Sequence, residues 1–304
     1  THIDVLCGHY ENVVRRNHHA FIADKKYLKL RGADTFYTAY VCHNLHFKVY
    51  GAMFLGQFKP ANEAAMELQK LLTPEIVRAS ADWLESYYPM EFRVYVRFGM
   101  WDHIKTIKPP SDSELFCFTT AVLYYAKSIA YAATGDIKNA EIYRDRFVNA
   151  KGLVPETRFL FNNSCQDILA VAQEMLDGEL FYRKQDFDKG FTHLRNAVRL
   201  DDELPYEEPW GWMQPARHAL GALLLEQERI AEAEAVYRAD LGIDGVLGRP
   251  CQNPDNVWSL HGLHECLQKS KKFEEARFIK QRLDLANARA DRPILASCFC
   301  RLTH

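Results

Sequence analysis

The sequence predicts an all-α protein, an irregular solenoid of about six to seven helical hairpins. Two observations support this: one pattern recurs along the chain, and the alternating patterns typical of strands are nearly absent. The pattern is an apolar helix, a short polar turn, an aromatic residue or Ile, and a small residue three positions later. The aromatic positions lie about 36 to 50 residues apart. A period of this length is typical of a helical repeat.

The copies of the pattern follow one another along almost the whole chain. In each copy the small residue lets two antiparallel helices approach closely, and the aromatic side chain fills the gap beneath the turn. Residues 1–9 are expected to be the last turns of a helix whose beginning lies upstream. The residues at the turns are Tyr10, Phe58, Trp101, Ile137, Phe187, Ile230 and Phe273.

The segments between the hairpins are predicted to be linkers. They are rich in proline and turn-forming residues, and they account for the length beyond a regular repeat. The acidic run "DDELPYEEP" is expected to be solvated. The linkers are "KPPSDSE", "LVPETRFLFNNS", "LPYEEPWGWMQP" and "LGRPCQNPDN".

Composition excludes several classes of protein. The chain of 304 residues has a net charge of −2, so no basic field favours nucleic acid or an anionic membrane as a partner. No apolar run approaches the roughly 20 residues that span a bilayer. The eight cysteines are scattered and no signal peptide is visible, which favours a reducing cytoplasm. No phosphate-binding glycine loop, dinucleotide fingerprint, nucleophile elbow or zinc-protease motif is present.

The segment "RHALGALLLEQERIAEAEAVYRADL" closely resembles a tetratricopeptide (TPR) repeat. The resemblance implies one TPR-like superhelical domain over residues 1–304, continued by upstream repeats and ending in a tail over residues 288–304. In this family the first helix of each hairpin lines a concave groove. The resemblance and the helical period place groove residues about 15, 12 and 8 positions before each turn residue. These positions are His2, His43, His46, Arg93, Met175, Glu179, His218, Trp258, His261 and Glu265.

Three of the groove histidines form a candidate metal site. His43 and His46 lie three apart on one predicted helix and share a face, and His2 lies on the first helix of the preceding hairpin. Neighbouring helices pack about 8–10 Å apart, so three imidazoles could converge on Zn, Fe or Cu with a position left open. The alternative is polar packing, or hydrogen bonding to a peptide in the groove.

The tail carries a second candidate, Cys298-Phe-Cys300. A relaxed disulfide is not expected to close readily across one intervening residue. Thiolates so placed favour a soft metal, thiol exchange or a redox role. The alternative is an extended tail with one cysteine packed and the other exposed.

The chain also resembles a group of long bacterial and fungal TPR proteins of poorly defined function. The shared blocks are "HI" at residues 2–3, "HNLHF" at residues 43–47, "PWGWMQPARHALGALLL" and "ASCFCR". This resemblance implies that His2, His43 and His46 belong to one inherited feature, and that further repeats precede residue 1. It implies no reaction.

Three hypotheses follow, of which the third is a purely structural scaffold. The first is a solenoid that binds a peptide, a protein tail or a small molecule in its groove through His43, His46, Arg93, His218, Trp258, His261 and Glu265. The second is an enzyme that uses a transition metal held by His2, His43 and His46, with Cys298 and Cys300 as further candidate ligands. In the second hypothesis Glu179 or Glu265 is a candidate acid or base.

Overall fold

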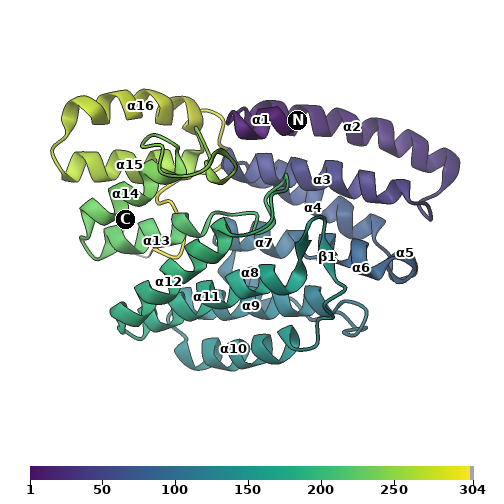
Figure 1. The fold of residues 1–304 in the computed structure, drawn as a ribbon. Coiled ribbons are helices and arrows are strands. Elements are labelled where there is room, and N and C mark those ends of the chain that lie inside the picture. The colour runs from purple at the N-terminus through teal and green to yellow at the C-terminus, as the bar shows by residue number, and fades with distance from the viewer. Residues whose placement is uncertain (302–304) are drawn as a thin grey trace.

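The computed structural model describes residues 1–301, and these residues are almost entirely helical (Figure 1). Each predicted turn separates two helices, and the second helix of each pair begins at the predicted turn residue. The prediction of an all-α repeat of six to seven hairpins is therefore confirmed. The pairs are α1 (His2–Leu6) with α2 (Tyr10–Arg31), α3 (Tyr37–Phe54) with α4 (Phe58–Leu71), α7 (Met90–Arg97) with α8 (Trp101–Thr106), α9 (Cys117–Ala133) with α10 (Ile137–Lys151), α11 (Cys165–Arg183) with α12 (Phe187–Asp202), α13 (Ala216–Glu226) with α14 (Ile230–Asp240), and α15 (Val257–Lys269) with α16 (Phe273–Asn287).

Short elements occupy the segments between the pairs. The predicted linker "LVPETRFLFNNS" contains a two-stranded antiparallel hairpin, in which Phe159 lies opposite Ser164. Two residues per strand are too few to show an alternating pattern, so this hairpin could not be predicted from the sequence. The short elements are α5 (Pro74–Ala79), α6 (Ala81–Leu84), η1 (Glu85–Tyr87), β1 (Phe159–Leu160), β2 (Asn163–Ser164) and η2 (Arg249–Cys251).

The residue three positions after each turn residue is buried where the two helices of a pair meet, and it is Ala or Gly in five of the seven pairs. Ala61, Ala140 and Ala233 have no exposed surface. At Gly190 an added Cβ would lie 3.0 Å from the backbone nitrogen of Tyr182 on the preceding helix. Only a small side chain leaves room for this approach, which is the reason that the repeat pattern predicts the pairing.

The helix pairs curve until the first and the last meet (Figure 1). In the figure the purple α1 and the yellow α16 reach the same edge of the molecule. Arg289, beyond α16, pairs with Glu11 on α2 at 3.1 Å, and the indole of Trp258 on α15 donates to the carbonyl of Met53 on α3 at 2.7 Å. The inner faces of the helices therefore surround an interior rather than an open groove.

Two segments fill this interior. The inner loop (residues 204–215) inserts Trp212 and Met213, which are buried. The tail (residues 288–301) continues from α16 and ends beside α13 and α14 (Figure 1). The expectation that the acidic run is solvated is wrong, because Glu207 and Glu208 of the inner loop are only 3% and 6% exposed. The last residues of the predicted tail, 302–304, lie outside the described part of the chain.

Within residues 1–301, no helix has the length and apolar character that crossing a bilayer requires.

Candidate functional site

The predicted groove residues lie on the inner side of the helices, and most of them contact the inner loop or the tail. Arg93 on α7 donates from Nη1 to the Trp212 carbonyl at 2.9 Å, and its guanidinium lies 5.0 Å from the Trp212 ring. Trp258 on α15 packs edge-to-face on Phe299 of the tail, with ring centroids 5.9 Å apart. Glu265 accepts two hydrogen bonds from Arg301, at 2.6 and 2.9 Å. The surface predicted to bind a ligand is thus occupied by the chain itself.

Two of the three candidate metal ligands lie together. The ring centroids of His2 and His43 are 5.8 Å apart, and Nδ1 of His2 lies 2.7 Å from a carboxylate oxygen of Glu208. His43 stacks on Phe161, and burial followed by the nearby His2 lowers its pKa to about 4. Neighbouring hairpins bring these rings together as the repeat geometry implies.

The third candidate ligand, His46, contacts the inner loop. Its Nε2 lies 2.7 Å from the sulfur of Met213 in the inner loop, and burial holds its pKa well below the ordinary value. Among residues 1–301 no group of three or more His, Cys, Asp or Glu side chains is placed to hold a metal ion. The metal site remains a prediction, and its test is described below.

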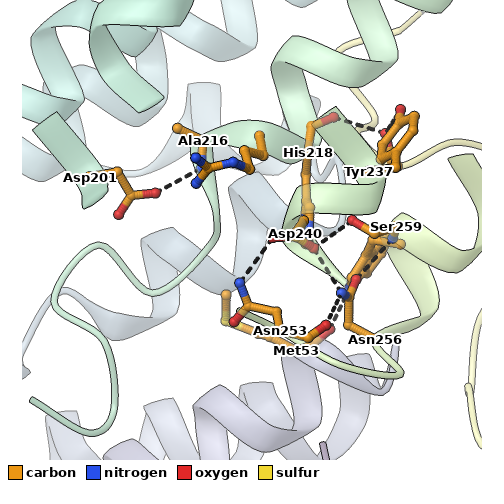
Figure 2. A network of polar contacts seen from close by, with 12 residues as sticks. Met53, Asp201, Ala216, His218, Tyr237, Asp240, Asn253, Asn256 and Ser259 are labelled. Atoms are coloured by element: carbon orange, nitrogen blue, oxygen red, sulfur yellow. Dashed lines mark hydrogen bonds and ion pairs between the residues drawn. The ribbon is translucent and has the colours of Figure 1, made fainter. Parts of the chain in front are cut away.

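His218 is the centre of a buried polar network (Figure 2). Its Nδ1 lies 3.0 Å from Nη1 of Arg97, and its Nε2 lies 3.1 Å from Asp240. A guanidinium can only donate, so Nδ1 accepts and the Nε2 proton is donated to Asp240. The imidazole is therefore neutral, in agreement with the lowering of its pKa by burial.

Asp240 is the acceptor that fixes this network. Ser259 Oγ donates to it at 2.6 Å, and the amides of Asn253 and Asn256 donate at 2.9 Å each (Figure 2). Burial acts to raise the pKa of Asp240, but His218 and the hydrogen bonds outweigh it, and the pKa lies below its ordinary value. The carboxylate is therefore ionised, and it orients both His218 and the start of α15.

A cavity of about 30 Å³ lies beside this network. A volume of this size accommodates one or two water molecules. Glu179 belongs to its wall and is held by Arg183 at 2.8 Å, while burial raises the pKa of the carboxyl. Other residues of the wall are Arg97, Tyr125, Met175, His218, Cys298 and Cys300.

The two tail cysteines are joined in a disulfide. The bond spans one intervening residue, Phe299, where the tail turns, and the two Cα atoms lie 5.2 Å from one another. That separation lies in the ordinary range for a disulfide. In this form the sulfurs are not metal ligands.

The remaining groove prediction, His261, lies next to the tail. Burial lowers its pKa, and the nearby Glu265 and a hydrogen bond with the Leu295 backbone act in the opposite direction.

Sequence reasoning missed several residues of this interior. Arg97 lies four positions after Arg93, on the same face of one helix, so the spacing could have indicated it. Trp210, Trp212 and Met213 make the inner loop too apolar for a solvated linker, which was a second available signal. The role of Asp240 could not be inferred from the sequence, because an aspartate at the end of a helix is an ordinary feature.

Comparison of the chain with models of known protein families, with curated protein sequences and with solved structures gives no match.

Proposed function

We propose that the protein binds an extended polypeptide segment in its groove, and that its own tail is the segment bound here. The observation that carries the proposal is how the tail is held. Gln57 donates to the carbonyl of Arg289 at 2.8 Å, Arg97 donates to that of Ser297, and Arg183 donates to that of Cys300. Because every residue has a main-chain carbonyl, such donors suit an extended chain of almost any sequence.

Side chains of the tail supply selectivity at four positions. Asp291 accepts hydrogen bonds from the backbone nitrogens of Phe58 and Lys59, at 2.6 and 2.8 Å, where α4 begins. A carboxylate is favoured at a helix N-terminus. Ile294 packs on Gly56, where an added Cβ would lie 3.0 Å from its Cδ1.

The other two positions lie near the end of the tail. Phe299 packs between Trp258 and Gly99, and Arg301 pairs with Glu265. We therefore expect a partner segment that contains an acidic residue and an aliphatic residue three positions after it. An aromatic residue should follow eight positions after the acidic one, and an arginine ten positions after it.

A partner must compete with a tethered segment. A short tether gives an effective concentration in the millimolar range, so a free peptide displaces the intact tail poorly. Cutting the chain between Asn287 and the tail removes this advantage and leaves every contact in place.

The experiment uses a full-length chain with a protease recognition site inserted between Asn287 and Ala288, which are both exposed. After cleavage, a fluorescent peptide of residues 289–301 is added and its anisotropy is measured. We expect the labelled peptide to exchange into the cut protein, and to bind the uncut protein at least tenfold more weakly.

Two matched peptides test the selectivity. Peptides with Phe299→Ala or Asp291→Ala are expected to bind at least tenfold more weakly, whereas Leu295→Ala, at an exposed position, is expected to have little effect. The proposal fails if the cut protein loses its tail, stays folded by circular dichroism and takes up no peptide. Equal binding of all four peptides also contradicts it.

A further inference from the structure

Four large apolar or aromatic side chains are exposed together at one edge of the molecule. Leu30, in the last turn of α2, and Phe36, just before α3, are 83% and 80% exposed. Tyr40 on α3 is more than half exposed and packs edge-to-face on Phe36, with ring centroids 5.6 Å apart. Trp83 on α6 is also more than half exposed, and it lines the same surface hollow as Phe36. We call these four residues the edge patch.

The edge patch lies where the helix array protrudes. In Figure 1 the end of α2 and its connection to α3 form the edge of the molecule away from α16, with α5 and α6 beneath them. Tyr27 of α2 packs on Tyr37 of α3 with ring centroids 4.3 Å apart, so the end of α2 is held against the start of α3. The hollow beside the connecting loop has a volume of about 400 Å³, and Ala39, Ile76 and Leu84 are among the apolar residues that line it.

Positive charge adjoins the edge patch. Residues 12–36 contain six lysines and arginines against two aspartates, and one of these, Asp24, is buried. The other, Asp34, is exposed in the connecting loop. Three exposed cations next to Leu30 form no ion pair within residues 1–301, and these are Lys26, Lys29 and Arg31. The net charge of −2 for the whole chain does not reveal this local excess, because acidic residues elsewhere in the chain outweigh it.

We propose that the edge patch docks on a membrane surface that contains anionic lipid. Leu30 and Phe36 insert at the boundary between head groups and acyl chains, where an apolar side chain loses its contact with water. Tyr40 and Trp83 suit the level of the head groups, at which tyrosine and tryptophan are enriched in membrane proteins. The three unpaired cations are attracted by the negative surface potential of the lipid.

The combination of side chains favours a membrane over other anionic partners. Nucleic acid is bound through its phosphates and through rings on which bases stack, and neither contact uses an exposed leucine such as Leu30. An acidic protein segment would account for the cations alone. Leu30 and Phe36 protrude at an edge, as insertion into a bilayer requires.

The edge patch is separate from the proposed peptide groove. The tail contacts Gly56, just after α3, whereas Phe36 lies just before this helix. A helix of 18 residues such as α3 is about 27 Å long. Membrane docking therefore does not rest on peptide binding, and either proposal can fail without the other.

Co-sedimentation of the full chain with vesicles tests the proposal. The vesicles are made of phosphatidylcholine alone, or of phosphatidylcholine with about one third phosphatidylserine. We expect the anionic vesicles to bind at least tenfold more tightly. Most of this difference is expected to be lost in about 1 M sodium chloride, where the Debye length is about 3 Å. Brominated acyl chains are expected to quench the tryptophan fluorescence of the wild type much more than that of Trp83→Phe.

A matched pair of variants tests the apolar contacts. Leu30→Ser/Phe36→Ser changes two exposed side chains, so we expect an unchanged melting temperature and at least tenfold weaker binding to the anionic vesicles. Phe278→Ser/Leu285→Ser is the control, because it removes one exposed aromatic and one exposed aliphatic side chain from α16. It is expected to bind as the wild type does.

A second pair tests the charges. Lys26→Gln/Lys29→Gln is expected to weaken binding to the anionic vesicles and to reduce its dependence on salt. Lys108→Gln/Lys138→Gln, at exposed positions elsewhere in the chain, is expected to change neither.

Three results would overturn the proposal. One is that the wild type does not sediment with the anionic vesicles. Another is that Leu30→Ser/Phe36→Ser binds them as the wild type does, or no more weakly than the α16 control. A third is that the wild type binds polyglutamate or single-stranded DNA through Lys26 and Lys29 and binds no vesicle, which would assign the cations to a different anionic partner.

Discussion

At the scale of single residues, burial decides what the polar side chains of the interior can do. His218 is neutral because Arg97 occupies one ring nitrogen and Asp240 the other. Glu207 in the inner loop shows the same principle for a carboxyl. One oxygen accepts from the Asn162 backbone at 2.7 Å, and the other has no partner within the described residues. The pKa of such a group lies far from its usual value, so its effect on stability can be measured as the pH is changed.

Glu207 is expected to make stability fall with rising pH. Burial raises its pKa to about 8, from an ordinary value of 4.5 in the unfolded chain. Between these values the folded protein keeps a proton that the unfolded chain releases, so the free energy of unfolding decreases as the pH rises from 4.5 to 8. Glu207→Gln has no such proton. It is expected to be about 1–3 kcal/mol more stable than wild type at pH 8 and nearly equal to it at pH 5.

Urea unfolding at a series of pH values measures this difference. Glu228→Gln, at an exposed position, is the control and is expected to shift the curves equally at every pH. A difference between Glu207→Gln and wild type that does not change between pH 5 and pH 8 contradicts the protonated carboxyl.

The metal hypothesis belongs to the same scale. It predicts close to one equivalent of Zn, Fe or Cu after expression in metal-replete medium, and loss of that metal in the His43→Ala/His46→Ala double variant. Elemental analysis of purified protein measures both. His18→Ala/His19→Ala, at exposed positions on α2, is the control. Metal well below one equivalent in the wild type would rule out the three-histidine site.

At the scale of the helix pair, one backbone geometry recurs with different residues. Four of the turns place a glycine at positive φ just before the second helix, for example Gly135 at +80°. Lys271 occupies the corresponding place before α16 at +58°. A side chain in this left-handed conformation costs roughly 1–2 kcal/mol, whereas glycine adopts it without a steric penalty.

Exchanging residues at these two turns should change stability in opposite directions. Lys271→Gly is expected to raise the free energy of unfolding by about 0.5–1 kcal/mol, and Gly135→Ala to lower it by about 1 kcal/mol. At Gly135 an added Cβ meets no atom within 4 Å, so a loss there reports the backbone alone. Chemical denaturation measures both variants. Changes of the same sign would contradict the shared geometry.

At the scale of the whole molecule, the tail joins the two ends of the helix array. Asp291 caps the start of α4, which lies 233 residues earlier in the chain. Ser297 Oγ donates to the carbonyl of His218 at 2.8 Å, and it therefore accepts from the Tyr237 hydroxyl at 2.6 Å. The tail therefore links helices from the two ends of the array.

Removing the Asp291 cap should loosen the tail and lower the stability of the whole fold only slightly. Asp291→Ala is expected to cost about 1 kcal/mol and to increase hydrogen exchange across residues 289–301. Asp136→Ala removes an ordinary local cap, whose carboxylate accepts from the Asn139 backbone at 3.1 Å. It is expected to cost a similar amount and leave exchange in the tail unchanged. Unchanged tail exchange in Asp291→Ala would mean that the cap does not hold the tail.

The sequence by itself determined the helix pairs, their order and the residue at which each second helix begins. It could do so because the evidence is local: a turn, an aromatic residue and a small residue three positions later lie within one hairpin, as at Phe58 and Ala61. It also placed His2 and His43 on adjacent inner faces, since neighbouring hairpins stack in chain order.

Only the tertiary structure decided what occupies the groove. The contacts that fill it join Arg93 to Trp212 across 119 residues and Arg97 to Ser297 across 200. Helical periodicity does not predict these contacts, because a linker or a tail has no repeating face. The same reason explains why the predicted ligand surface proved to be covered by the chain.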